Sequence, residues 1–343
     1  MKRIDSVDTI RLFAIIAVIA IHTKPFAVDS TTNETYYYLN IIINQLARFA
    51  VPFFFVISGY FFGQKIRKGN DVVETAKAMI YRVGTIYLVW SLIYLLPYNL
   101  TAIIEYGILG PLKVSYWHFI SLLNDPLTIP FKGTKIHLWF LISLIYSVII
   151  CSVFVYYKMF RSLFFFAIAL YLFGVLSKAY ADSPLGITVN FNTRNGPFLG
   201  TLFFVIGYYI SDYSYKKYWL YYGLTIFVIG CLFHFSEIYL LMKYYGSSLF
   251  QDYVFGTILM GVGAALIALS NHPILQNKIL SKMGSMTLGI YVSHVVFVDI
   301  LRPFDRIYHS AIWQLGYIVL VLTCSILLVL ILSRTQFTRK FIF

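Results

Sequence analysis

The chain has 343 residues, of which 59% are hydrophobic and only 12% charged. Soluble proteins carry about 25% charged residues, so this composition excludes an ordinary soluble domain and predicts an integral membrane protein surrounded by lipid. The net charge of +13 indicates basic cytoplasmic loops rather than a nucleic-acid partner, because Lys and Arg gather on the cytoplasmic side of membrane proteins.

Apolar runs long enough to cross a bilayer recur along the whole chain. They predict an all-α integral membrane protein, a bundle of about ten transmembrane helices forming one domain over residues 1–343. The predicted spans are 10–27, 40–63, 79–96, 136–157, 162–179, 196–212, 218–236, 251–270, 285–302 and 311–333. Residues 112–124 are too short to span and are expected in the membrane interface. The first run has no small-residue cleavage site, so we expect it to stay in the mature protein.

The distribution of Lys and Arg predicts which side each loop occupies. With both termini inside, the short cytoplasmic segments hold Lys2, Arg3, Lys65, Arg67, Lys68, Lys77, Lys158, Arg161, Lys216, Lys217, Lys278, Lys282, Arg334, Arg339 and Lys340. The longer external segments hold fewer, namely Lys24, Lys113, Lys132, Lys135, Lys178, Arg194, Lys243, Arg302 and Arg306. This bias predicts an N-in, C-in orientation.

The first span carries an Arg and a His in an otherwise apolar stretch. Arg11 and His22 are separated by LFAIIAVIAI, and eleven residues turn a helix by about 1100°, which places both on one face roughly 16 Å apart. Polar groups within a span face a protein interior or a wet cavity. In one interpretation His22 is a general base and Arg11 binds an anionic donor or holds the geometry. In the other, Arg11 is an interfacial anchor paired with Asp8, and His22 is a hydrogen-bonded buried imidazole.

The second span and the loop after it are the next candidates. The span reads RFAVPFFFVISGYFF, and a buried Arg48 needs a partner. Its Pro52, Ser58 and Gly59 favour helix packing. The basic residues that follow indicate either cytoplasmic topology or a phosphate-binding rim for a nucleotide-containing donor, and the candidates are Lys65, Arg67, Lys77 and Arg82.

Further polar residues lie near the ends of later spans. His137 opens HLWFL, in which Trp139 is a candidate interface aromatic. Arg194, beside the helix start at NGPFLG, is either a loop cation or a binder of anionic or polyhydroxyl groups. In LGIYVSH, Tyr291 and His294 share a face, and His294 is either a second site imidazole or, as we favour, a hydrogen-bonded core residue. The candidates for substrate binding are Arg48, His137, Trp139, Arg194, Tyr291 and His294.

Several enzyme classes lack their motifs here. The sequence contains no GxxxxGK[ST], HExxH, GxSxG or GxGxxG, which argues against P-loop ATPases, zincins, serine hydrolases with a nucleophile elbow and dinucleotide-binding enzymes. Cys151, Cys231 and Cys324 lie in apolar runs without CxxC spacing. We therefore predict no metal site and no structural disulfide.

Five blocks together resemble the membrane acyltransferase-3 family, the bacterial carbohydrate O-acyltransferases. In chain order they are IDSVDTIRLFAIIAVIAIH, VPFFFVISGYFF, HLWFLISLIY, RNGPFLGTLFFVIGYYI and LGIYVSH. The resemblance implies a multi-pass protein of the bacterial cytoplasmic membrane, acyl-CoA (acetyl-CoA) as co-substrate, and an exported or lipid-linked saccharide as acceptor. It implies no permanently bound cofactor. It also implies that Arg11 and His22 match the catalytic pair of the family. We add Asp8, which lies one helical turn before Arg11, to these catalytic candidates.

One block departs from the family. Many members carry paired arginines at the start of the third helix, where this chain reads KAMIYR, with Lys77 and Arg82. A different class of function stays open: a saccharide or lipid-linked sugar exporter without covalent chemistry, since buried Arg and His suit a transporter as well. No inverted repeat supports that alternative.

Overall fold

A computed structural model describes residues 3–126, 129–213, 218–305, 307–308 and 310–342, and all regular structure in these ranges is helical. The residues Lys2, Lys216, Lys217 and Arg306, used above to predict topology, lie outside the described residues. The helices are α1 (Asp5–Thr23), α2 (Glu34–Leu46), η1 (Ala47–Phe49), α3 (Ala50–Arg67), α4 (Val72–Ile93), α5 (Ala102–Tyr106), α6 (Gly110–Asn124), α7 (Ile129–Lys132), η3 (Ile136–Leu138), α8 (Trp139–Tyr156), α9 (Phe160–Leu176), α10 (Pro197–Ile210), α11 (Trp219–Tyr245), α12 (Gly256–Leu269), η4 (Pro273–Leu275), α13 (Lys278–Gly284), α14 (Thr287–Asp305), α15 (Ala311–Leu332) and α16 (Gln336–Arg339).

Each predicted span overlaps a helix, which confirms an all-α membrane protein. Among the described residues, six helical segments are long and apolar enough to cross a membrane: 5–23, 34–67, 136–156, 219–245, 287–305 and 311–332. The helices α9, α10 and α12 are apolar but shorter, and the first half of α4 carries the charged residues Glu74, Lys77 and Arg82. The count of ten crossings and the N-in, C-in orientation stay predictions. Helices suit this setting because a bilayer core offers no water to satisfy backbone groups.

The second predicted span is broken rather than continuous. Residues 47–49 form a 3₁₀ turn between α2 and α3. Pro52 has no N–H to donate to the carbonyl of Arg48, four residues earlier, so the regular α-helical bonding is interrupted there. The break places Arg48 at a bend between two helices instead of on a regular helix surface.

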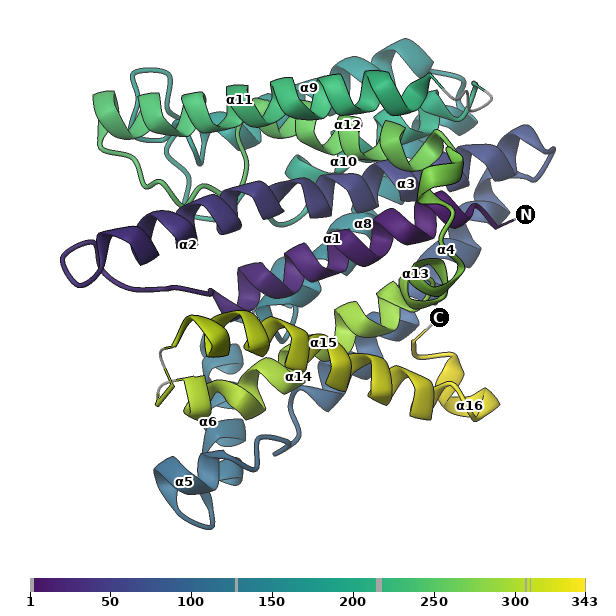
Figure 1. The fold of residues 1–343 in the computed structure, drawn as a ribbon. Coiled ribbons are helices and arrows are strands. Elements are labelled where there is room, and N and C mark those ends of the chain that lie inside the picture. Colours follow the sequence, from purple (N-terminus) through teal and green to yellow (C-terminus); the bar gives the residue numbers. More distant parts are fainter. Residues whose placement is uncertain (1–2, 127–128, 214–217, 306, 309, 343) are drawn as a thin grey trace.

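The helix α1 lies between two groups of helices (Figure 1). The group α9–α12 packs on one side of the α2–α3 rod, and the pair α14–α15 lies on the other side of α1. The helices α3 and α10 approach very closely, because a Cβ on Gly59 would lie 1.9 Å from the carbonyl oxygen of Phe204. This agrees with the predicted packing role of Gly59.

Both chain ends lie at the same end of the bundle in Figure 1, near the start of α4 and beside α13 and α16. We call this the terminal end. The opposite end, where α1 finishes and α15 begins, is called the far end.

Candidate functional site

A cavity of about 560 Å³ opens at the terminal end of the bundle. Residues from α1, α3, α4, α8 and α14 line it, and its exposed lining residues include Lys65 and Arg82. Its inner part is apolar and includes the buried side chains of Phe140, Leu141 and Tyr291. Pockets for small molecules and cofactors have volumes of about 300–1,000 Å³, so this one can hold part of a ligand.

Arg11 lines the cavity and is also paired with Asp8. Its Nη1 lies 2.9 Å from Asp8 Oδ1, and its guanidinium stacks over the ring of Phe61 at 5.4 Å. The buried Asp8 also accepts a hydrogen bond from Arg3 Nε at 2.5 Å. The structure thus contains the predicted Arg11–Asp8 pair. It leaves the guanidinium beside the cavity, as the functional interpretation requires.

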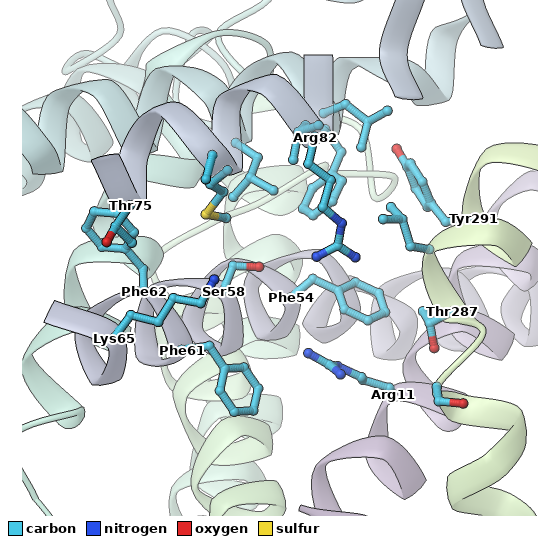
Figure 2. Close-up of a pocket in the computed structure, with 18 of the residues that line it drawn as sticks. Arg11, Phe54, Ser58, Phe61, Phe62, Lys65, Thr75, Arg82, Thr287 and Tyr291 are labelled. Carbon is cyan, nitrogen blue, oxygen red and sulfur yellow. The ribbon is translucent and has the colours of Figure 1, made fainter. Parts of the chain in front are cut away.

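Two of the four predicted donor-binding residues reach the cavity. Lys65 and Arg82 line it, and neither forms an ion pair within the described residues. Figure 2 shows the guanidinium groups of Arg82 and Arg11 pointing into the same space. Arg67 instead pairs with Asp212 and stacks over Tyr208, and Lys77 pairs with Glu74 on the surface. The structure does not bring Arg67 or Lys77 to this cavity.

Three imidazoles meet inside the bundle, one each from α1, η3 and α14. The ring centroids of His22 and His294 are 5.1 Å apart, those of His137 and His294 5.3 Å, and those of His22 and His137 6.2 Å. His137 and His294 are fully buried, whereas His22 is half-buried. We call these residues the histidine cluster.

The hydrogen bonds of the cluster assign its tautomers. His294 Nδ1 lies 2.6 Å from the carbonyl oxygen of Tyr291, and His137 Nε2 lies 3.4 Å from that of Val292. Because a carbonyl oxygen only accepts, these ring nitrogens donate. The other nitrogens, His294 Nε2 and His137 Nδ1, are buried and find no hydrogen-bond partner among the described residues. Each therefore offers a lone pair. His294 makes the hydrogen bond expected of a core residue, and its ring also lies 5.1 Å from that of His22, so the structure is compatible with both of its predicted roles.

Tyr291 separates the cavity from the histidine cluster. It lines the cavity, its ring centroid lies 5.7 Å from His137 and 5.9 Å from His294, and its hydroxyl donates to the carbonyl of His137. Phe140 packs against it at 5.3 Å. His22 lies beyond this aromatic wall and is not among the lining residues. The residue Asp8 is fourteen positions from His22, roughly 21 Å along the helix, so it contacts Arg11 and not the imidazoles.

A second charged group surrounds Asp252 at the far end. Its carboxylate lies 2.8 Å from Arg48 Nη1, 3.4 Å from Arg194 Nη1 and 3.0 Å from Lys178 Nζ. We call these four residues the Asp252 cluster. Asp252 lies in the loop before α12. Burial alone raises the pKa of its carboxyl, but the cations of Arg48, Arg194 and Lys178 outweigh burial and lower that pKa below its usual range.

Trp139 belongs to this region rather than to an exposed interface belt. It is buried, and the guanidinium of Arg194 stacks over its ring at 5.2 Å. A small cavity of about 30 Å³ lies among Arg48, Arg194, Asp252 and Trp139, with Ile21 on its border. Asp252 was not among the residues predicted from the sequence. The sequence indicated only that a buried Arg48 needs a partner, and it did not indicate which residue that partner is.

In the described ranges, no group of three or more His, Cys, Asp and Glu residues is arranged to hold a metal ion. The three cysteines are free.

Comparison with known proteins finds relatives much longer than this chain. An amino-acid racemase of Enterococcus faecalis is 32% identical over 243 residues, which cover 66% of this chain and 31% of the racemase. A second amino-acid racemase of the same species is 26% identical over 358 aligned residues, covering 97% of this chain and 46% of the relative. A serine/alanine racemase of Enterococcus gallinarum is 26% identical over 62% of this chain and 30% of its own length. The chain thus spans less than half the length of these curated relatives. No solved structure matches it significantly.

The family comparison covers nearly the whole chain. The match, described as an acyltransferase domain, extends over residues 4–330, from before α1 to within α15. It includes Arg11, the histidine cluster and the Asp252 cluster. The chain belongs to the acyltransferase-3 family, and its long apolar helices are those of a multi-pass membrane protein.

Proposed function

We propose that this protein moves an acyl group, acetyl in the simplest case, from cytoplasmic acyl-CoA to a hydroxyl of an envelope or exported saccharide, in the bacterial cytoplasmic membrane. The observation that carries the proposal is the alignment of two sites along α1. A cavity with cations at its mouth ends at Tyr291, and the histidine cluster lies immediately behind that wall.

The open end of the cavity suits the phosphates of an acyl-CoA. Arg11, Lys65 and Arg82 line it, and guanidinium and ammonium groups are the usual phosphate ligands in proteins. The apolar interior beyond them suits the thin pantetheine arm. In this proposal the acyl group passes between Phe140 and Tyr291 to reach His22.

His22 is the proposed general base. It takes the proton from an acceptor hydroxyl as the hydroxyl oxygen attacks the thioester carbonyl, and the carbon–sulfur bond then breaks. The thiolate of CoA leaves and receives that proton from the imidazolium. The lone pairs of His294 Nε2 and His137 Nδ1 have no partner in the described residues. In this proposal one of them accepts the N–H of His22 when substrate is bound and so fixes the orientation of its ring.

A direct test uses purified full-length protein with labelled acetyl-CoA and candidate glycans. We expect the label to be transferred to glycan, and we expect His22→Ala to abolish transfer while the protein still inserts and purifies. His272→Ala, in the loop before η4, is the matched histidine control and should retain transfer. Near-normal transfer by His22→Ala would remove His22 from the mechanism.

The same assay separates transfer from export. Movement of a glycan across proteoliposomes without any labelled product would support the exporter alternative instead. Because one relative is named a serine/alanine racemase, free serine, which also carries a hydroxyl, belongs in the acceptor panel.

A further inference from the structure

We propose that the Asp252 cluster binds an acidic group of the acceptor, a carboxylate or a phosphate, and thereby selects acidic saccharides over neutral ones. The acceptor role rests on the proposed function. The binding of an acidic group does not, because it follows from the charges at the far end.

The cluster contains more positive than negative charge. Arg48, Arg194 and Lys178 share the single carboxylate of Asp252, and the side chains of Arg48 and Arg194 are only 12% and 16% exposed. Burying a cation without an opposite charge of equal size costs free energy. Binding of a further anion at this cluster is therefore favoured.

Other carboxylates nearby along the chain are engaged elsewhere. Glu237 accepts hydrogen bonds from the backbone N–H groups of Phe255 and Gly256 and from the hydroxyl of Tyr180. Asp182 accepts one from the hydroxyl of Ser247. Among the described residues, neither forms an ion pair with the three cations, so the excess positive charge is left for a ligand.

The two arginines differ in how firmly they are held. Arg48 donates to Asn44 Oδ1 from Nη2 at 2.8 Å and from Nε at 3.2 Å, and its Nη1 donates to Asp252. Arg194 has only long contacts, 3.4 Å to Asp252 and 3.5 Å to Asn195, and its Nη2 donates to no group in the described residues. Arg194 therefore has donor capacity to spare, on a guanidinium oriented by stacking on Trp139. A guanidinium of this kind is suited to a bidentate bond with a carboxylate or phosphate.

The position of the cluster connects it to His22. The cavity between Arg48, Arg194 and Asp252 has a volume of about 30 Å³, which exceeds the roughly 10–15 Å³ that one water needs and leaves room for a small anionic group. Ile21, the residue before His22, borders it. An acidic group held there would bring a hydroxyl on a neighbouring carbon of the same sugar towards the imidazole.

Binding is measured first, without any acyl donor. Methyl glucuronide and methyl glucoside 6-phosphate are compared with neutral methyl glucoside by calorimetry on the full-length protein in detergent. We expect at least one acidic glycoside to bind about tenfold more tightly than the neutral one, the size expected for a hydrogen bond to a charged group. Equal binding of all three would overturn the inference.

Variants then assign the preference to Arg194. Arg194→Gln should bring the acidic-to-neutral ratio of affinities close to one, and Arg194→Lys, which keeps the charge but loses the fork of donors, should give an intermediate ratio. Lys243→Gln, in the last turn of α11, is the control that removes a positive charge elsewhere. It should leave the acidic-to-neutral ratio of affinities unchanged. An unchanged ratio in Arg194→Gln would contradict the assignment.

Transfer assays separate the two proposals. Acidic glycosides that bind preferentially but are never acetylated would refute the proposed function and leave the anion site standing. Acetylation of neutral and acidic glycosides with equal kcat/KM would support the function and refute the selection of acidic acceptors.

Discussion

The two ends of the bundle hold their cations in different ways. At the terminal end, Lys65 and Arg82 border a large open cavity, and neither has a carboxylate partner in the described residues. Arg11 lines the same cavity and shares the carboxylate of Asp8 with Arg3. At the far end, Arg48, Arg194 and Lys178 surround Asp252 beside a cavity only large enough for one small group. Open, separated cations suit a large ligand with several phosphates, whereas a closed cluster suits one anionic group in a fixed place.

Blocking the cavity should give the largest effect on transfer and would distinguish the ends most sharply. Ser58 points into the cavity (Figure 2), and Ser58→Trp would fill the space needed by the donor. We expect transfer to fall by about a thousandfold or more, since positioning of reactants supplies much of the rate. Leu88→Trp, on the exposed side of α4, should transfer normally. Normal transfer by Ser58→Trp would show that the donor enters elsewhere.

Removing the carboxylate at the far end should mainly affect stability. Asp252→Asn leaves three cations without their shared partner, and breaking a buried ion pair costs about 3–5 kcal/mol. The free energy of unfolding in mixed micelles should fall accordingly. Asp212→Asn removes the half-exposed partner of Arg67 and should cost less than about 1 kcal/mol. If both variants lost the same free energy of unfolding, the ion pairs of Asp252 would be as exposed to solvent as the pair between Arg67 and Asp212, which would contradict a buried Asp252 cluster.

A smaller effect is expected from a single cation at the cavity mouth. Arg82→Gln should raise the KM for acyl-CoA about tenfold with little change in kcat, because it removes one charge-assisted phosphate contact. Arg161→Gln, an exposed arginine at the start of α9, controls for loss of charge at the same end. An unchanged KM in Arg82→Gln would place the phosphates away from α4.

The sequence was informative where the relevant geometry is local. Helical periodicity alone places Arg11 and His22 on one face, and both do face α14: Arg11 lines the cavity with Thr287, and His22 meets His294. The pairing of Arg11 with Asp8, three residues away, was predictable for the same reason. Spans, too, were predicted from local composition.

Contacts between distant segments were not predictable in this way. Asp252 lies 204 residues from Arg48, and no periodicity links them. Arg67 belongs to a basic run that suggested phosphate binding, but its partner Asp212 is 145 residues away. His137 and His294 were each recognised as candidates, yet only the folded chain brings their unpartnered nitrogens beside His22.

The smallest effect concerns pH and tests whether Asp252 is ionised in the folded protein throughout the physiological range. Its folded pKa lies below the unfolded value of about 3.9, so its contribution to stability is present above that value and is lost as the pH falls through the folded pKa. The difference in unfolding free energy between wild type and Asp252→Asn should therefore be constant from about pH 8 to pH 5 and shrink only below about pH 4. A difference that already shrinks between pH 7 and pH 5 would mean that burial, not the three cations, dominates the carboxyl, and that the far end lacks the excess positive charge on which selection of acidic acceptors depends.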